Sequence, residues 1–291
     1  MSHCQAALLA DRAVLGVTGA DARKFLQGML TNDADRLAEG NAMHAGLLSP
    51  QGKILFDMFV AARADDFLID VARDKGAELG KRLGFYRLRS KVEIKEDPDF
   101  KVAAVWEGTP RLPEGAIGFA DPRLSALGMR VLLPGSASVS ELGCSRADEA
   151  DYHARRIKLG VPEGGRDYAF GDAFPHEALF DQLNGVDFKK GCYVGQEVVS
   201  RMEHRGLARK RIVPVAGASA LPASGTPVTA EGIAIGTLGS TSGAMGLALI
   251  RLDRAEEALA KGATLKAGEV PITLRQPEFA RFAVPATALS A

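Results

Sequence analysis

The chain has 291 residues, of which 46% are hydrophobic and 25% are charged, and its 36 basic residues balance 36 acidic ones. This composition is typical of a globular protein of two or three domains, and it excludes a chain that binds nucleic acid or anionic membranes through its overall charge. No apolar run approaches the roughly 20 residues that span a bilayer, and Asp11 and Arg12 interrupt the N-terminal segment where a signal peptide would be apolar. The three cysteines, Cys4, Cys144 and Cys192, are too few and too dispersed for a disulfide framework. We therefore expect a cytoplasmic protein in a reducing compartment, without membrane association.

The N-terminal half mixes strand and helix patterns without a strict strand–helix–strand rhythm. Thr18 or Asp21 can cap the first helix, because a short side-chain oxygen accepts from the free amides of a first turn. Helical spacing and turn residues predict, in chain order, a strand at 13–17, a helix through 25–30, three strands within 44–71, a helix at 73–84, and strands at 92–97 and 100–106. This mixture indicates an α+β fold with antiparallel sheets.

The C-terminal half changes character twice. Residues 145–160 predict a helix with acids early and bases late, the order that suits the helix dipole. Residues 162–188 are irregular, which in a compact protein is typical of a functional segment or of one that wraps another domain. After Arg211, short apolar segments separated by Gly, Pro and Ser indicate a small β-barrel or sandwich with one short helix at 255–262. A domain boundary is therefore expected at residues 206–211.

Cys192 lies in the segment KKGCYVGQEVVSR, residues 189–201, where Gly191 and Gly195 allow sharp turns on both sides. A helix that starts near Gly195 and the two lysines upstream would both stabilise a thiolate, the reactive form of cysteine. A buried, structural cysteine fits this pattern equally well. No general base is adjacent, so a papain-like nucleophile is not supported. One turn into the helix, Arg201 is positioned to pair with Glu197.

The stretch of residues 79–92 is strongly basic and contains no acid: Lys81, Arg82, Arg87, Arg89 and Lys91. One interpretation is a solvated helix end and strand. The other is an anion site, in which Tyr86 stacks on a flat ring and the guanidinium groups bind a carboxylate tail. The five histidines show no spacing typical of metal ligands, so no metal site is predicted.

The run Lys190-Gly191-Cys192-Tyr193-x-Gly195-Gln196-Glu197, followed by Arg201, resembles the signature of the YgfZ-type folate-binding proteins. These are relatives of the glycine-cleavage T-protein, an aminomethyltransferase, and the mitochondrial member of the family is an iron–sulfur cluster assembly factor. The resemblance extends over nearly the whole chain, because residues 17–33, 44–58 and 85–94 and the glycine-rich C-terminal third also resemble the family.

The resemblance implies a three-part fold with a central opening that binds tetrahydrofolate. Two interleaved ferredoxin-like α+β modules would occupy residues 1–205, the second roughly 49–140, and a β-barrel would occupy residues 206–291. Cys192 would be a functional thiol, and iron–sulfur assembly proteins and client iron–sulfur enzymes would be the partners. Support of an iron–sulfur tRNA-thiolating enzyme would link the protein indirectly to tRNA modification. The implied folate contacts are Asn32, Asp57, Tyr86, Arg87 and Arg89.

Two departures from the family pattern bear on function. The T-proteins carry an acidic pair in the segment 52–57, whereas this chain has Phe56 beside Asp57. Aminomethyl transfer needs a positioned carboxylate, so a folate-dependent transferase is the alternative rather than the main hypothesis. Some YgfZ-type members place a tryptophan in the segment where this chain has Arg12. A third hypothesis, an RNA-interacting protein, rests on seven basic residues against three acids in 187–211, but the neutral overall charge argues against direct RNA binding.

Overall fold

A computed structural model describes residues 4–64, 66–206 and 208–286 of the chain. The contacts divide the chain into two compact units, each described by itself below. The first unit comprises Met1–Tyr152 and Leu183–Gln196, and the second comprises His153–Gln182 and Glu197–Ala291. Within the described ranges, every helix is too short or too polar to cross a membrane.

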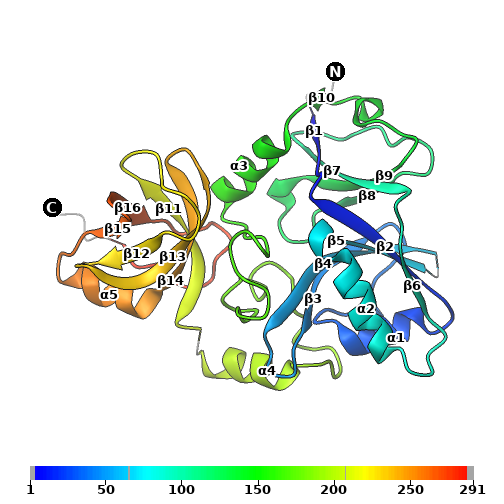
Figure 1. Cartoon of the computed structure of the whole chain (residues 1–291), viewed down its shortest axis with the longest axis horizontal. Coiled ribbons are helices and arrows are strands. Elements are labelled where there is room, and N and C mark those ends of the chain that lie inside the picture. Colours follow the sequence, from blue (N-terminus) through cyan, green and yellow to red (C-terminus); the bar gives the residue numbers. More distant parts are fainter. Residues whose placement is uncertain (1–3, 65, 207, 287–291) are drawn as a thin grey trace. The chain divides into compact units, whose positions relative to one another are not determined.

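The first sheet of the first unit is antiparallel, with the strand order β3-β4-β5-β2-β6. Its strands are β2 (Arg12–Thr18), β3 (Ala42–Leu48), β4 (Ile54–Arg63), β5 (Asp66–Ala72) and β6 (Glu93–Glu96). Helices α1 (Ala22–Met29) and α2 (Gly76–Tyr86) lie beside these strands in Figure 1. One face of the sheet forms a single apolar core with them, in which Phe56 of β4 joins Leu26 of α1 and Leu79 of α2.

The second sheet of this unit has the order β10-β1-β7-β9-β8. Its strands are β1 (Gln5–Leu8), β7 (Phe100–Trp106), β8 (Ile117–Ala120), β9 (Met129–Pro134) and β10 (Ser145–Arg146), and short 3₁₀ helices lie at Arg73–Lys75, Ser125–Leu127 and Val139–Leu142. Cys4 and Cys144 form a disulfide where β1 pairs with β10, with Cα atoms 4.8 Å apart. The expectation of unpaired, dispersed cysteines was therefore wrong, because the parallel pairing of β1 and β10 joins residues 140 positions apart.

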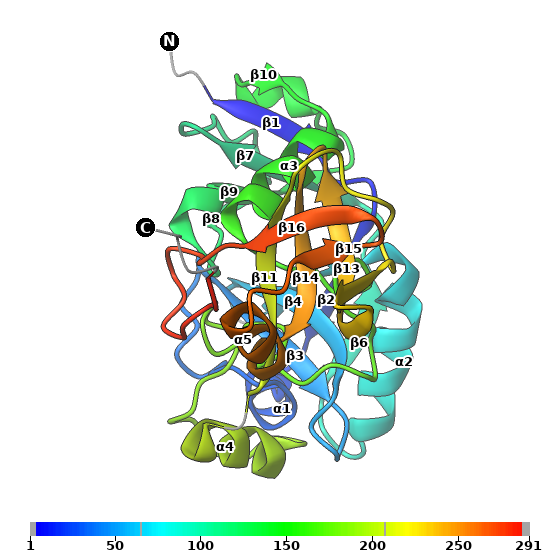
Figure 2. The same cartoon turned by 90° about the vertical axis from the view of Figure 1, so that its left-hand side faces the viewer.

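The second unit contains a closed barrel of six strands in the order β11-β14-β13-β12-β15-β16, which Figure 2 turns toward the viewer. The strands are β11 (Lys210–Gly217), β12 (Pro227–Ala230), β13 (Ile233–Ser242), β14 (Met245–Arg251), β15 (Leu265–Ala267) and β16 (Val270–Leu274). Closure leaves no unpaired strand edge. Helix α5 (Leu252–Ala260) follows β14 and buries Ala255 in the barrel core.

The irregular segment after α3 (Glu149–Leu159) wraps the barrel, one of the two roles expected for it. Asp167 accepts from the backbone N–H of Ser240 in β13 at 2.7 Å and from Arg156 Nη1 at 2.6 Å. Gly239 is required at this contact, because an added Cβ would lie 2.7 Å from Asp167 Oδ1. The segment is thus fixed to the barrel by buried hydrogen bonds.

The expected fold class, α+β with a C-terminal β-barrel, is confirmed. The predicted boundary at 206–211 follows α4 (Gln196–Arg205), and its residue 207 lies outside the described residues. Strands β4 and β5, which follow residue 49, pair in the same sheet as β2 and β3, and the proposed domain limits stay predictions. The cap prediction was wrong, because Asp21 Oδ2 accepts from Lys91 N–H at 2.7 Å instead of from an amide of α1.

Candidate functional site

The β3–β4–β5 face that points away from α1 and α2 is polar. Successive residues of a strand point to opposite faces, so the neighbours of the core residues turn to this side. The strand register aligns His44 of β3, Phe59 of β4 and Asp70 of β5 in one cross-strand row. Asp57 lies on the same face, opposite Gly46, and all four side chains of this face are at most 7% exposed. Burial of charged groups in such a row requires partners.

Asp70 binds two buried arginines. Its Oδ1 accepts from Arg12 Nε at 2.6 Å, and its Oδ2 accepts from Arg130 Nη1 at 2.6 Å. Arg130 belongs to β9, so this ion pair joins the second sheet to the first. Both arginines are at most 3% exposed, so their charges need buried carboxylates nearby, and Arg130 Nε also lies 3.6 Å from Asp121 Oδ2.

A second acid completes the network. Arg123 donates through Nε and Nη2 to the two oxygens of Asp121, at 3.0 and 2.8 Å. Burial acts against the charge of Asp121, but Arg123 and Arg130 hold the pKa of Asp121 below its usual value. The hydroxyl of Tyr152 accepts from Arg123 at 2.9 Å and from Arg130 at 3.0 Å, so the phenol links the two arginines.

The ring of Phe59 is surrounded by the same three cations. The guanidinium carbons of Arg130, Arg123 and Arg12 lie 4.0, 4.7 and 5.8 Å from its centroid. A buried cation over an aromatic face is stabilised by the ring quadrupole. Arg12 is therefore part of a buried ion network.

His44 is neutral on this face. Burial and the neighbouring charge of Arg123 lower the pKa of His44 to about 4, although Asp57 partly opposes this. Its Nδ1 lies 3.3 Å from the carbonyl oxygen of Leu183, in the segment that leads to the cysteine motif. The face thus places a second buried carboxylate, that of Asp57, near an uncharged imidazole.

Residues 183–190 cross this part of the unit and are held by α1's C-terminal turn. Asn32 Nδ2 donates to the carbonyls of His44 at 2.9 Å and Asn184 at 2.7 Å. Thr31 Oγ1 donates to the carbonyl of Gly185 at 2.5 Å. Both side-chain N–H groups of Asn32 thus hold this segment in place, and its role as a folate contact stays a prediction.

Lys190 anchors the cysteine loop to α1. Its Nζ donates to the carbonyls of Gln27, Leu30 and Asn32 at 2.8, 2.5 and 2.8 Å, where the last turn of a helix leaves acceptors free. Burial lowers the pKa of Lys190 to about 8, against the opposing charge of Asp33. The ammonium of Lys190 therefore binds the end of α1, and stabilisation of a thiolate at Cys192 by Lys189 or Lys190 stays a prediction.

Cys192 is exposed and is the one free cysteine, and the described residues include all three cysteines. Helix α4 begins at Gln196, so the thiol precedes its first turn. Gly195 has φ +82° and lies against the β3–β4 turn, where an added Cβ would be 2.5 Å from the carbonyl oxygen of Ser49. Tyr193 is buried, with Lys190 Nζ 5.2 Å from its ring centroid. Two fixed points, Lys190 and Gly195, therefore flank an exposed thiol.

The remaining predicted residues fall elsewhere. Arg201 donates to Glu197 at 2.8 Å, as predicted for one turn of α4. Tyr86, Arg87 and Arg89 lie at the exposed end of α2, which packs on the opposite face of the sheet from Asp57. The structure therefore does not bring the basic stretch together with Asp57 and Asn32. The basic stretch lies at the end of α2, which covers one face of the sheet, whereas the side chain of Asp57 lies on the other face.

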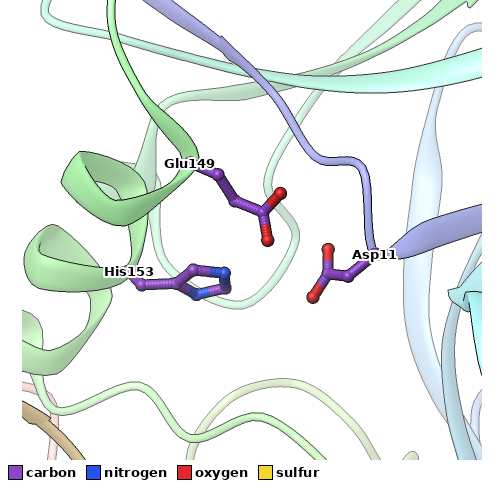
Figure 3. Close-up of side chains that lie close together, drawn as sticks. All are labelled: Asp11, Glu149 and His153. Atoms are coloured by element: carbon purple, nitrogen blue, oxygen red, sulfur yellow. The ribbon is translucent and has the colours of Figure 1, made fainter.

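Two acidic groupings were invisible in the sequence. Glu149, at the start of α3, accepts from the backbone N–H of Ala10 at 3.0 Å and points toward Asp11 in Figure 3. In the second unit, His176, Asp181 and Glu203 come within 4.8 Å of one another. Arg211 already binds both oxygens of Asp181 at 2.9 Å, which gives that carboxylate a structural role. The expected absence of a metal site stays a prediction.

Sequence reasoning missed the central ion network. Only Asp57 and Asn32 of the predicted residues lie near it, while Arg12, Asp70, Asp121, Arg123, Arg130 and Tyr152 were not singled out as site residues. The available signal was the charged residues inside strands that otherwise read as apolar, namely Asp70 in FLIDVA and Arg130 in MRVLLP. A charge inside a buried strand implies a partner on a facing element.

Comparisons with known proteins agree on one family. The model of the CAF17 C-terminal beta-barrel domain matches residues 209–282. The chain is 38% identical over 230 residues to the iron-sulfur cluster assembly factor IBA57 homolog, mitochondrial, of Neurospora crassa, covering 71% of this chain and 52% of that protein. It is 35% identical over 270 residues to the human iron-sulfur cluster assembly factor IBA57, mitochondrial, covering 83% and 76%. The chain thus spans about half the length of the Neurospora relative.

A solved structure has the same fold. The crystal structure of the glycine cleavage system aminomethyltransferase T from Bartonella henselae matches with a TM-score of 0.76, over 96% of this chain and 87% of that one, at 14% identity. At this identity the likeness shows the fold alone. The names of the relatives correct one expectation: they are mitochondrial proteins, which contradicts the cytoplasmic location predicted from composition and cysteine content.

Proposed function

Because the chain belongs to the IBA57 family of iron–sulfur cluster assembly factors, we propose that it acts in the assembly of iron–sulfur clusters through the thiol of Cys192. The observation that carries this proposal is the exposed, free Cys192 between two fixed points. A thiol that only filled space would be buried, as structural cysteines usually are. Exposure lets a thiolate reach iron or a partner's sulfur.

One thiolate is a partial ligand set. Iron–sulfur clusters are usually held by four cysteine thiolates. The first unit's other two cysteines are joined in a disulfide, so a cluster at Cys192 would take its remaining ligands from a partner. Iron–sulfur assembly proteins and client enzymes are the proposed partners, with the cluster as cargo. The other use of the same exposed sulfur is attack of the Cys192 thiolate on a partner's disulfide, which forms a mixed disulfide and releases the partner's second sulfur as a thiolate.

We propose in addition that the chain is of the YgfZ type and binds tetrahydrofolate on the polar face of the β3–β4–β5 strands. The shared fold with an aminomethyltransferase supports this, together with the buried Asp57 beside neutral His44. Asp57 would accept from a ring N–H, and Asn32 would act indirectly by holding the segment through Asn184. A few precisely placed polar groups, such as a carboxylate that accepts from a ring N–H, commonly fix the orientation of a small ligand.

Aminomethyl transfer is not part of the proposal. Phe56, which stands in the segment where the T-proteins have an acidic pair, is 1% exposed and packs in the apolar core under α1 and α2. Of Phe56 and Asp57, only Asp57 points to the polar face of the sheet. The purified protein should therefore show negligible transfer from an aminomethylated lipoyl carrier to tetrahydrofolate, and turnover on the order of 1 s⁻¹ would contradict this.

The thiol is tested by complementation of a deletion strain. Cys192→Ala and Cys192→Ser should fold normally, with unchanged far-UV circular dichroism, but should fail to restore several cluster-dependent enzymes, including an iron–sulfur tRNA-thiolating enzyme. The matched control is the double variant Cys4→Ser/Cys144→Ser, which removes the disulfide and leaves Cys192 as the single thiol. Full activity of the client enzymes with Cys192→Ala would overturn the proposal.

A second variant tests whether the position of the thiol matters. Gly195→Ala keeps the sulfur but forces the loop away from Ser49, because the added Cβ would overlap the carbonyl oxygen. Client enzyme activity should fall, while alkylation of Cys192 by iodoacetamide should proceed at or above the wild-type rate. A variant with intact client activity would show that the loop need not be fixed.

Folate binding is tested separately by calorimetry. Tetrahydrofolate should bind with a Kd between about 1 μM and 1 mM, the range of small-metabolite sites. Asp57→Asn should weaken binding about tenfold, which corresponds to about 1.4 kcal/mol. The control Glu78→Gln, at an exposed site on α2, should bind normally. No heat at millimolar ligand would sink the folate proposal and leave the thiol proposal standing.

A further inference from the structure

The end of α2 exposes large apolar side chains. Phe85 is 70% exposed and Leu88 is 88% exposed, while Tyr86 beside them is 39% exposed. The apolar face of α2 packs into the core through Leu79 and Leu83. Phe85, Tyr86 and Leu88 are therefore not needed for the packing of α2. We name the residues Lys24, Phe85, Tyr86, Leu88 and Arg89 the α2-end surface.

Leu88 is held outward by an ordered turn. Ser90 N–H donates to the carbonyl of Arg87 at 2.8 Å, and Arg87 Nη1 donates to the carbonyl of Val92 at 3.2 Å. Leu88 has φ +45°, a left-handed conformation that costs a branched, non-glycine residue about 1 kcal/mol or more. The exposure of Leu88 and its backbone conformation both cost free energy in the unbound protein. Burial of the Leu88 side chain by a partner would remove the cost of exposure.

A hollow of about 780 Å³ opens beside Leu88. Its lining consists of Asp21, Lys24, Phe25, Leu88, Arg89 and Ser90. The lining holds one acid, Asp21, whose Oδ2 accepts from Lys91 N–H and which keeps its negative charge. Lys24 and Arg89 outnumber it, so the hollow has an excess of one positive charge beside its apolar wall.

We propose that the α2-end surface docks an acidic segment of a partner protein, with one apolar side chain of that segment inserted beside Leu88. Residues 79–92 contain five cations and no acid, which attracts an acidic chain and repels a basic one. Aromatic side chains and arginine are enriched where proteins bind each other. The hollow also gives an apolar side chain a place to be buried, which a flat anionic membrane would not use.

The surface is separate from the proposed cluster and folate sites. Asp57 lies on the opposite face of the sheet that α2 covers, and Lys190 and Gly195 fix the Cys192 loop to α1 and to the β3–β4 turn. The experiment therefore uses direct binding, with no cluster-dependent enzyme as its readout, so its failure would not count against Cys192.

Binding is measured by fluorescence anisotropy of labelled peptides with the full chain. The probes are a glutamate-rich peptide with phenylalanine and leucine at its centre, an all-glutamate peptide of equal length, and the lysine counterpart of the first. The first peptide should bind best and the lysine peptide should not bind. Leu88→Asp should weaken the first peptide about tenfold, and Arg89→Glu about threefold with a smaller salt dependence, as for a central anchor and a rim charge.

Two matched controls have the same chemistry elsewhere. Ile233→Asp changes another 70% exposed apolar residue, and Lys261→Glu reverses another exposed cation, both on the second unit. Neither should change peptide binding. Equal binding by wild type and Leu88→Asp, or no binding by the first peptide, would overturn the proposal. Two other results would also overturn it, in a protein that does not bind the peptide. One is binding of phosphatidylserine vesicles that Leu88→Asp abolishes, and the other is self-association in ultracentrifugation that Leu88→Asp abolishes.

Discussion

The two faces of the β3–β4–β5–β2–β6 sheet bury their side chains by opposite means. Toward α1 and α2 the sheet presents an apolar core that includes Phe56, Met58 and Leu83. On the other face, Asp70 is buried between Arg12 of the same sheet and Arg130 of the neighbouring sheet, and His44 is buried in the same cross-strand row. The strands alternate between the faces residue by residue, so one sequence carries both environments.

The difference lies in what each face loses when one side chain is removed. An apolar core loses contacts and leaves a cavity, a cost that depends on how far the surroundings can relax. A buried ion network loses the opposite charge that stabilised its remaining members, because those charges stay buried away from water. Trp106, the single tryptophan, is buried in the same unit and reports unfolding of both faces by fluorescence.

The largest effect is expected on the polar face. Asp70→Ala leaves Arg12 and Arg130 without their shared carboxylate, and should lower the free energy of unfolding by about 3–5 kcal/mol. Urea unfolding followed by Trp106 fluorescence measures it. The control Glu78→Ala breaks an exposed ion pair with Lys75 and should have little effect. If both variants unfold at the same urea concentration, the network does not hold the sheets together.

A smaller effect is expected on the apolar face. Leu83→Ala removes a fully buried side chain and should cost about 2–4 kcal/mol, whereas Leu83→Met keeps the volume and should cost less than about 1.5 kcal/mol. The same urea unfolding gives both values. The comparison between the faces breaks down if Leu83→Ala costs more than Asp70→Ala.

The polar face should also make stability depend on pH. The pKa of His44 is about 4 in the folded chain and 6.5 as its ordinary value, so its neutral form contributes stability that is complete above about pH 6.5 and is lost as the pH falls toward 4. From pH 7 to pH 5 the loss from this group should be about 2 kcal/mol. His44→Gln, which cannot titrate, should lose correspondingly less, and parallel pH curves for the two proteins would exclude His44 as the cause.

The smallest effect concerns the segment that crosses the polar face. Lys190→Met removes three hydrogen bonds to the end of α1 and should cost about 1–2 kcal/mol, because the net contribution of a hydrogen bond is small when the unfolded chain bonds to water instead. The exposed neighbour provides the control, Lys189→Met, which should be silent. Faster hydrogen exchange at residues 183–192 in Lys190→Met would show that this anchor orders the segment. Unchanged exchange would assign the ordering to Asn32 and Thr31 instead.

The sequence by itself determined the local structure and the identity of the cysteine motif. Apolar runs bounded by turn residues predicted the strands β2–β5, and the helical spacing of Phe25, Leu26 and Met29 predicted α1. Short apolar segments with frequent glycine and proline predicted the barrel. These signals are local, and each can be read within one element.

Only the tertiary structure decided which residues share a site. Asp70 and Arg130 are paired across two sheets, Cys4 and Cys144 across 140 positions, and no local pattern encodes either pairing. The lysine of the cysteine motif proved to anchor α1, and the basic stretch proved to lie on the far side of the sheet from Asp57. The physical reason is that strand register and sheet packing determine which side chain pairs with a buried charged residue. The neighbouring residues in the sequence determine only the face of the sheet on which that residue lies.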